Sequence, residues 1–393
     1  MKTILFLSPV TWRYSNTQIK EFVELLSKNH KILYLHCYEL EYVSLKHFIL
    51  NRKQREKIIH TWKNILTSKR IVFPTFLTRN TYSISERITK IDGWIVLLQI
   101  QIMLVLRRSE NCVYANTAFF PPLFTKLKNV KWIFDFYDRS YDENSVENNT
   151  IMRTNEKWLL NTSKLVLVKS QYYITEVIPS INSKNKSWVV LSKIGYSVKK
   201  HLLMFPNKKK SSKNVVIGYA GGLSERLDYQ LIIDTVEKYP NVTFVFAGCK
   251  YNNIINLSKI SFNEFAKKLL SYPNVVLEEN RKSRAQQAEI MSKFTLGWIP
   301  YDISEYFNKY CHPTKFLEYM AVGLPVLSTR IPSLIEHSKH ISFIDSAKSM
   351  QKILQNVDKL LAPNTIYQRK QFAIEHSIEN RYTQLSSLLK AVL

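Results

Sequence analysis

Apolar residues recur along the chain in two alternating patterns, short continuous runs and longer segments with helical spacing. The short runs predict buried parallel strands, which in the first half lie at residues 4–7, 32–36, 112–115, 132–136, 165–168 and 189–191. The helical segments lie between them, at residues 17–27, 45–66, 86–106, 152–161 and 172–177. This alternation is typical of a parallel sheet covered by helices on both faces, so it predicts a doubly wound α/β domain.

The same alternation starts again after residue 213. Strand patterns lie at residues 215–219, 243–247, 275–277, 295–299 and 325–328, and helical patterns at 229–239, 264–270, 285–293, 314–322 and 366–393. The segment between the halves is polar and lysine-rich, as an exposed connection is. We therefore predict a Rossmann-like domain at 1–197, a linker at 198–213, a second Rossmann-like domain at 214–375, and a final helix at 376–393 that crosses back to the first domain. Ligands are expected in the cleft between the domains.

The composition is that of a globular chain. Its 393 residues are 45% hydrophobic, with 7 Trp, 22 Tyr and 20 Phe, enough to fill two cores and too many for a disordered chain. The longest apolar stretch, residues 94–106, is interrupted by Gln99 and Gln101, so no transmembrane helix is expected. The four cysteines are widely spaced, and the start lacks a signal-peptide pattern. Both features favour a cytoplasmic protein with reduced thiols.

The net charge of +25, from 56 Lys and Arg against 31 Asp and Glu, favours an anionic partner. Residues 45–70 hold eight basic residues and one acid among apolar side chains, a pattern typical of helices that lie on anionic membranes. A solvated domain helix is the alternative. Nucleic acid is a rival partner for such charge, but no nucleic-acid module is recognised. We expect a peripheral protein on the inner face of the plasma membrane, docked through Arg52, Lys53, Arg55, Lys57 and Trp62.

The segment from His312 to Pro325 carries the first chemical motif. Pro313 suits the first turn of a helix and Gly323 its end, while Lys315 and Glu318 fall on one side. A helix start attracts a pyrophosphate, Lys315 adds a charge, and Glu318 can accept hydrogen bonds from a ribose diol. On spacing alone, an exposed ion pair on a surface helix explains the same residues.

Three of the eight glycines follow the strand at 215–219 or lie within it, at Gly218, Gly221 and Gly222. Without Cβ atoms, such a turn lets backbone N–H groups approach a phosphate, and Arg226 can clamp it. The spacing is not GxGxxG, which disfavours a nicotinamide dehydrogenase. The structural alternative is a plain strand-to-helix turn that Asp228 caps.

Together these motifs resemble the glycosyltransferases of the GT-B fold, in particular the retaining family-4 group and related teichuronic-acid-type bacterial polysaccharide transferases. The likeness rests on the glycine turn at 218–228, the Ile-Pro-Tyr sequence at 299–301 and the Pro-x-Lys-x-x-Glu-Tyr run from Pro313 to Val326. It is specific over residues 215–332 and only general in the first half. The resemblance implies a GT-B architecture, two Rossmann-like domains that face an interdomain cleft.

The resemblance also implies the site. Glu318 would hold the donor ribose, and the donor phosphates would lie on Lys315 and the helix start at His312, Pro313 and Thr314. Gly221, Gly222 and Arg226 would line the same pocket. Family-4 enzymes usually have a glutamate that touches the transferred sugar, eight residues before the one that matches Glu318. This chain has Tyr310 there, so we place Tyr310 in the donor site and the identity of the sugar stays open. On the acceptor side we place Trp12 and Arg13.

The expected reaction transfers a sugar from a nucleotide-diphosphate donor to a glycan or lipid-linked glycan, in bacterial surface polysaccharide synthesis. No Asp-x-Asp motif is present, so neither a metal nor another cofactor is expected, and fixed cations would stabilise the leaving group. Asp138 is the candidate general base for an inverting reaction; capping a helix or pairing with Arg139 is its structural alternative. A nucleotide-sugar epimerase, a non-catalytic sugar-nucleotide binder and a nucleic-acid binder remain as other functions.

Overall fold

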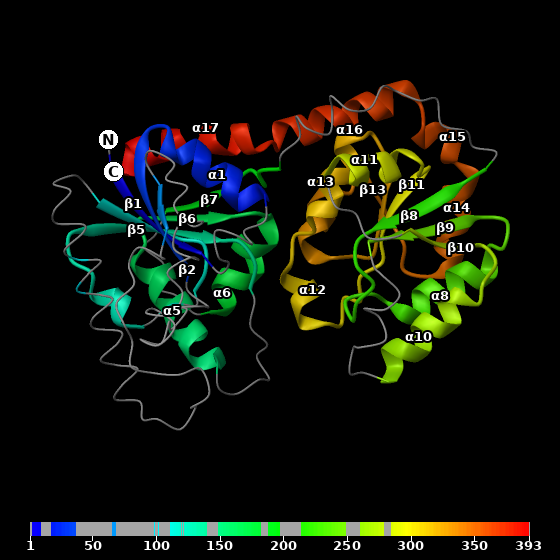
Figure 1. The fold of residues 1–393 in the computed structure, drawn as a ribbon, viewed down its shortest axis with the longest axis horizontal. Coiled ribbons are helices and arrows are strands. Elements are labelled where there is room, and N and C mark those ends of the chain that lie inside the picture. The colour runs from blue at the N-terminus through cyan, green and yellow to red at the C-terminus, as the bar shows by residue number, and fades with distance from the viewer. Residues whose placement is uncertain are drawn as a thin grey trace, which may run out of the picture.

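The computed structural model describes residues 2–8, 17–36, 65–67, 98, 101, 111–118, 120, 122–139, 148–181, 188–196, 214–248, 260–278 and 284–392. Two parallel β-sheets with flanking helices lie side by side (Figure 1). We call the elements from β1 to β7 the first lobe and those from β8 to α16 the second lobe.

The first lobe contains a seven-stranded sheet in the order β3-β2-β1-β4-β5-β6-β7. Its strands are β1 (Lys2–Ser8), β2 (His30–His36), β3 (Ile65–Thr67), β4 (Asn111–Ala115), β5 (Val130–Phe136), β6 (Leu165–Val168) and β7 (Trp188–Leu191). The described helices are α1 (Thr17–Ser27), the 3₁₀ helix η3 (Pro122–Lys126), α5 (Asn148–Thr162), the π-helix η4 (Tyr173–Val177) and α6 (Ile178–Ser180).

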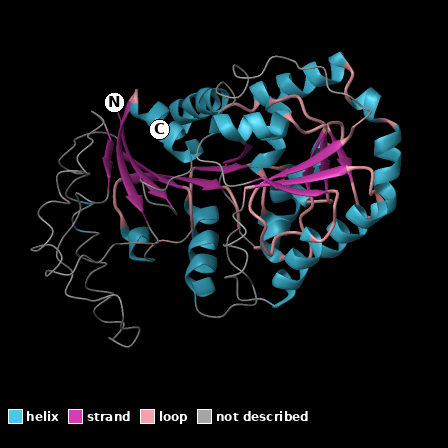
Figure 2. Cartoon of the chain, turned by 45° about the vertical axis from the view of Figure 1, so that its right-hand side comes forward, coloured by secondary structure: helices cyan, strands magenta, loops and turns pink. Residues whose placement is uncertain are grey.

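The second lobe contains a six-stranded sheet in the order β10-β9-β8-β11-β12-β13. Its strands are β8 (Val216–Ala220), β9 (Thr243–Ala247), β10 (Val275–Glu278), β11 (Leu296–Ile299), β12 (Val326–Ser328) and β13 (Ile341–Phe343). Helices cover this sheet as well (Figure 2): α8 (Tyr229–Lys238), α10 (Ile260–Leu270), α11 (Arg284–Ser292), α12 (Tyr306–Tyr310), α13 (Thr314–Ala321), η5 (Pro332–His337), α14 (Ala347–Gln355), α15 (Val357–Leu360) and α16 (Pro363–Glu375).

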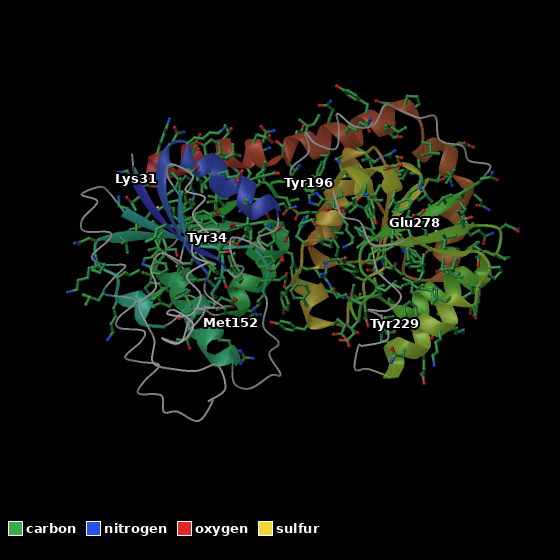
Figure 3. All side chains as sticks on the ribbon, in the orientation of Figure 1. Lys31, Tyr34, Met152, Tyr196, Tyr229 and Glu278 are labelled. Carbon is green, nitrogen blue, oxygen red and sulfur yellow. The ribbon has the colours of Figure 1, made fainter. Side chains whose placement is uncertain are left out.

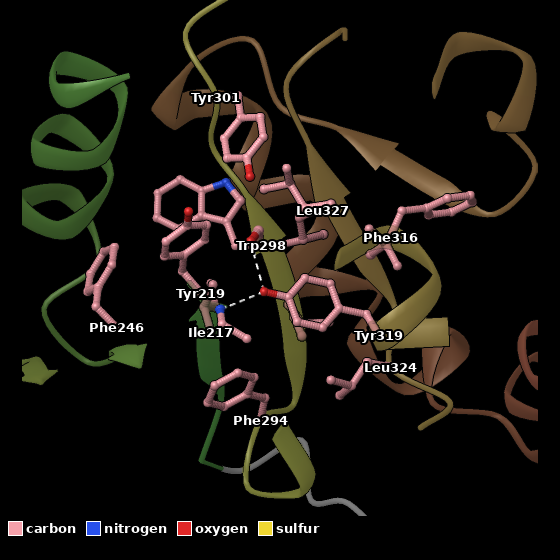
Figure 4. Close-up of a cluster of buried hydrophobic side chains, with 14 of the residues drawn as sticks. Ile217, Tyr219, Phe246, Phe294, Trp298, Tyr301, Phe316, Tyr319, Leu324 and Leu327 are labelled. Atoms are coloured by element: carbon pink, nitrogen blue, oxygen red, sulfur yellow. Dashed lines mark hydrogen bonds between the residues drawn. The ribbon is translucent and has the colours of Figure 1, made fainter. Parts of the chain in front are cut away.

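Buried strands and one buried tyrosine fix the position of α13. The strands β6 and β11 are buried at every residue, as expected for parallel strands with helices on both faces. Tyr319 on α13 reaches into the sheet, where its hydroxyl accepts a hydrogen bond from the Ala220 N–H at 2.8 Å and donates toward the Trp298 carbonyl at 3.2 Å (Figure 4). A Cβ on Gly297 would overlap the Tyr319 ring. Helix α13 is therefore held in register with β8 and β11.

The chain crosses between the lobes beside α16. The N–H groups of Gly195 and Tyr196 both donate to the His376 carbonyl at 3.0 Å, and Ile378 N–H donates to the Tyr196 carbonyl at 2.9 Å. Tyr196 lies between the lobes in Figure 3. Helix α17 (Ile378–Val392) then packs on α1, and its apolar side chains join the core of the first lobe (Figure 1).

Two predicted elements differ from the structure. Ile65 and Leu66 were expected at the end of a helix but lie in β3, because they pair with Ile32 and Leu33 of β2. The helical pattern from residue 366 is two helices, α16 and α17, since the crossover interrupts it at His376 and Ser377. The short strand β13 was not predicted.

The other residues of the predicted helix at 45–66 lie outside the described residues, as does most of the predicted helix at 86–106, of which Leu98 and Gln101 are described and helical. The linker predicted at 198–213 also lies outside them. Among the helices that the structure describes, none combines the length and apolar character needed to cross a membrane.

Candidate functional site

The two lobes meet at the carboxyl ends of β5 and β6. Asp138, just after β5, accepts a hydrogen bond from the His312 N–H of the second lobe at 3.3 Å. The Tyr173 hydroxyl donates to the Tyr310 carbonyl at 2.7 Å. Because ligands of open α/β sheets bind at the carboxyl ends of strands, this interlobe contact is the place where a site is expected.

The glycine turn and the start of α13 lie against each other. The Lys315 Nζ donates to the Tyr301 hydroxyl at 3.2 Å and lies 5.2 Å from the centre of the Tyr219 ring. A Cβ on Gly221 would overlap the Lys315 side chain and lie 2.7 Å from its Nζ. The absence of a side chain at position 221 therefore makes room for the lysine, and the structure joins the two motifs that the sequence singled out.

The charge of Lys315 is retained in this setting. Burial by itself lowers the pKa of a lysine, but the Tyr219 and Tyr301 hydroxyls and the Glu318 carboxylate raise the pKa of Lys315 above its ordinary value. The ammonium thus stands beside the first turn of α13, where the helix dipole also favours anions. This pair of features can bind a diphosphate.

Arg226 is held next to the same loop by groups that sequence reasoning missed. Its Nε donates to Asn308 Oδ1 at 2.8 Å, and Nη2 lies 3.2 Å from Cys311 Sγ. The guanidinium carbon lies 4.4 Å from the centre of the Tyr301 ring. Asn308 is completely buried and donates to the Arg226 and Asp302 carbonyls at 2.8 Å. No local pattern in the sequence links Asn308 to Arg226, because the contact spans 82 residues.

Glu318 lies one turn after Lys315 and is partly buried. Its Oε2 accepts a hydrogen bond from Gln287 Nε2 on α11 at 2.9 Å. Lys315 is bonded to Tyr301, not displayed on an exposed helix face, so the surface ion-pair alternative does not describe it. In the glycine turn, Asp228 caps α8 by accepting from the Leu231 N–H at 2.9 Å, as its structural alternative predicted.

The carboxyl group of Asp138 has the most strongly shifted pKa at the interlobe contact. Burial, and to a smaller extent the charge of Asp135, raise its pKa to about 8, although the His312 N–H and the charge of Arg226 oppose the shift. Arg139, the expected alternative partner of Asp138, forms a buried ion pair with Glu156 at 3.2 Å. Asp138 is thus a largely protonated carboxyl group at neutral pH, placed between the lobes.

Tyr310 and His312, two predicted donor-site residues, both lie at the contact between the lobes. The ring of Tyr310 packs into the hydrophobic cluster of the first lobe and lies 5.3 Å from the Arg139 guanidinium carbon, so it anchors the lobes together. Its predicted role on the donor side of the site stays a prediction. His312 is buried, and its two ring nitrogens have no hydrogen-bond partner among the described residues.

Seven predicted residues lie outside the part of the chain that the structure describes: Trp12, Arg13, Arg52, Lys53, Arg55, Lys57 and Trp62. Within the described part, Pro313 precedes α13 and Thr314 opens it, and Gly222 is exposed beside Gly221. No group of three or more His, Cys, Asp or Glu side chains in that part is arranged to hold a metal ion.

No protein-family model matches the chain. It is 24% identical over 221 residues to a protein of Bacillus subtilis (strain 168) assigned as a teichuronic acid biosynthesis glycosyltransferase. The match covers 53% of this chain and 53% of that protein, about half the length of each. It is consistent with the resemblance found in the sequence motifs.

The fold is similar to solved structures along its whole length. A sucrose-phosphate synthase from Thermosynechococcus elongatus has a TM-score of 0.68 at 13% identity, with 100% of this chain and 99% of that chain covered. An Anabaena protein solved with UDP and glucose has a TM-score of 0.64 at 12% identity, with 99% of both chains covered. A glycosyltransferase from Rickettsia africae ESF-5 has a TM-score of 0.62 at 13% identity, with 100% and 98% covered. The chain has the GT-B fold, as predicted.

Proposed function

We propose that the protein is a glycosyltransferase that moves a sugar from a nucleotide-diphosphate donor to a glycan or lipid-linked glycan in bacterial surface polysaccharide synthesis. The observation that carries this proposal is the contact between Lys315 at the start of α13 and the side-chain-free position of Gly221. The half-length similarity to an assigned teichuronic acid glycosyltransferase supports the reaction class, and the Anabaena structure with UDP and glucose supports the donor class.

The donor diphosphate lies at the start of α13 in this proposal. Lys315 and backbone N–H groups at the start of α13 bind its oxygens, and Arg226 supplies a second cation. Glu318 accepts hydrogen bonds from the ribose hydroxyls, and Gln287 orients it through the 2.9 Å hydrogen bond. The donor sugar then extends from the second lobe toward Asp138.

Transfer requires a base for the acceptor and stabilisation for the leaving diphosphate. In its deprotonated form Asp138 takes the proton of an acceptor hydroxyl, whose oxygen bonds to the anomeric carbon as the bond to the diphosphate oxygen breaks. The developing charge on that oxygen is met by Lys315, Arg226 and the helix start, which act without a metal.

The acceptor and the place of action rest on sequence alone. The residues proposed for membrane docking (Arg52, Lys53, Arg55, Lys57 and Trp62) and for the acceptor (Trp12 and Arg13) lie outside the described residues. A basic patch on the acceptor-side lobe suits a lipid-linked glycan at the inner face of the plasma membrane. Flotation with anionic liposomes should be lost after charge reversal at Arg52, Lys53 and Arg55.

The central experiment compares Glu318→Ala with Glu289→Ala, an exposed glutamate on the neighbouring helix α11. Release of nucleoside diphosphate in the presence of donor and acceptor should be lost in Glu318→Ala and kept in Glu289→Ala. In calorimetry, binding of the nucleoside diphosphate should likewise be lost in Glu318→Ala and kept in Glu289→Ala. Conversion of the donor alone by the unsubstituted protein would instead support an epimerase, and unaltered transfer by Glu318→Ala would contradict the proposed site.

A further inference from the structure

Arg226 is a cation whose contacts in the candidate site are with neutral groups. Its Nε donates to Asn308 Oδ1 at 2.8 Å, and its Nη2 lies 3.2 Å from Cys311 Sγ. None of the ion pairs between described residues includes Arg226. Because a guanidinium stays protonated in proteins, this positive charge is available to an anionic ligand.

The contacts with Asn308 and Cys311 occupy one edge of the guanidinium. The group is planar and has five N–H donors, and Nε shares an edge with Nη2. Asn308 and Cys311 therefore use one donor each. The other three donors lie on Nη1 and on the outer side of Nη2. With that end a guanidinium can donate two parallel hydrogen bonds to a phosphate group.

Two aromatic rings also pack against the guanidinium. Its central carbon lies 4.4 Å from the centre of the Tyr301 ring and 4.5 Å from the centre of the Phe307 ring. Phe307 and Asn308 are neighbours on α12, and Cys311 directly follows that helix. Helix α12 and the residue after it thus supply most of the contacts that hold the arginine side chain.

Asn308 is itself fixed in position. Its side chain is completely buried, and its Nδ2 donates to the Arg226 and Asp302 carbonyls, each at 2.8 Å. One amide group therefore contacts both the backbone and the side chain of Arg226. Ordering a flexible side chain on binding costs free energy, and a side chain that is already held avoids this cost. The contacts of Asn308 provide such an arrangement for Arg226.

The same contacts place Arg226 close to the meeting of the two lobes. Cys311 is followed by His312, whose N–H donates to Asp138 at 3.3 Å. The guanidinium thus lies beside the segment that leads from the candidate base to the start of α13, where the proposed function places the donor diphosphate.

We propose that Asn308 is a positioning residue which, together with Phe307, fixes the Arg226 guanidinium so that its free end meets the donor diphosphate. This inference rests on the proposed function, in which Arg226 supplies the second cation for that diphosphate. Asn308 acts through the arginine and not on the ligand. Loss of the Asn308 amide should therefore affect binding only while Arg226 is present.

The test is a double-mutant cycle in the full chain, with UDP binding measured by calorimetry. Arg226→Met should raise Kd by about 10- to 100-fold, the range of one charge-assisted hydrogen bond. Asn308→Ala should raise Kd by about 2- to 10-fold, because the ligand must then order the arginine. The double variant should bind UDP as Arg226→Met does, without a further loss.

Phe307→Ala is the second variant, because the Phe307 ring is 38% exposed and its removal spares the core. It should raise Kd in the presence of Arg226 and have no effect beside Arg226→Met, so it decides the question if Asn308→Ala does not fold. In transfer assays, Asn308→Ala should lower kcat by a larger factor than it raises KM for the donor. The reason is that the leaving diphosphate gains negative charge in the transition state.

Asn274→Ala is the matched control. The Asn274 amide donates to the Val236, Tyr239 and Val242 carbonyls at 3.1 to 3.2 Å, much as Asn308 bonds carbonyls of its own surroundings. Asn274 precedes β10, at the end of the parallel sheet opposite the site. Its substitution should lower Tm and leave the Kd for UDP unchanged.

Two results would reduce Asn308 to a structural residue and overturn the inference: an equal loss of UDP affinity with and without Arg226, or unchanged binding in Asn308→Ala. Full affinity in Arg226→Met would also overturn it, while the proposed function would stand on Lys315 and Glu318. If UDP does not bind the unsubstituted protein, GDP, ADP and dTDP take its place. Failure of all four to bind would overturn the proposed function and this inference with it.

Discussion

The His312 N–H donates to Asp138 Oδ1 at 3.3 Å, and the two residues belong to different lobes. His312 stands two residues before the first residue of α13, and Asp138 two residues after the last residue of β5. The candidate base and the candidate diphosphate site are therefore joined by one hydrogen bond across the interlobe contact. Because separation of the lobes would break this hydrogen bond, we expect lobe closure and chemistry to be coupled.

Asp138→Asn should abolish most of the activity. The amide keeps an oxygen that can accept from the His312 N–H but cannot take a proton, so kcat should fall by about 10²- to 10⁴-fold, the usual contribution of a general base. Donor affinity, measured by calorimetry, should change little. The exposed Asp358→Asn substitution on α15 serves as control and should leave kcat unchanged.

The pH dependence follows from the raised pKa of Asp138. Because the group acts as a base only when deprotonated, kcat should rise with pH until about 8 and then level off. Stability should move the other way: the raised pKa stabilises the protonated folded state, and this contribution falls as pH rises from about 4 to about 8. A kcat that is flat between pH 6 and 9 would exclude Asp138 as the base.

Gly221→Ala should weaken binding of the donor diphosphate. The new methyl group would overlap the Lys315 side chain, so the ammonium must leave its position beside Tyr301. Loss of one charge-assisted hydrogen bond corresponds to about 10- to 100-fold in Kd. Gly222→Ala adds the same methyl group at an exposed position, and the difference in Kd between the two variants isolates the lysine contact. Equal increases of Kd in the two variants would show that the contact between Gly221 and Lys315 does not determine donor binding.

The meeting of Gly221 with Lys315 was predictable because it follows from sequence patterns and a topological rule. A buried strand followed by glycines, and a helix bounded by Pro313 and Gly323, both have local signatures. Parallel strands then bring their carboxyl ends to one edge of the sheet. The sequence therefore predicted two parallel sheets and the side of the second sheet where the two motifs meet; that a donor binds there stays a prediction.

The position of Tyr310 was not predictable in the same way. Its ring packs against first-lobe residues such as Tyr172, at 6.3 Å between ring centres, and its carbonyl accepts from a tyrosine 137 residues earlier. Such contacts depend on how two folded lobes come together and leave no periodicity in the chain. The same reason explains why the contact of Asn308 with Arg226 was missed. For β3, the misleading signal was local: an Ile-Leu pair fits a helix and a strand equally, and pairing with β2 decided between them.

Arg381→Met should destabilise the first lobe by loosening α17. Arg381 and Asp135 are both buried, and their ion pair of 2.5 Å ties the last helix to the centre of the first sheet. Removing one partner of a buried pair leaves the other charge uncompensated, which costs about 3–5 kcal/mol. Arg330→Met is the matched control, because its 2.8 Å pair with Asp345 is 54% and 53% exposed and contributes at most about 1 kcal/mol. In thermal unfolding, Tm should fall much further for Arg381→Met than for Arg330→Met. Hydrogen exchange in α17 should accelerate for Arg381→Met alone. Equal losses of Tm, or unchanged exchange in α17, would show that apolar packing on α1 holds this helix without the ion pair.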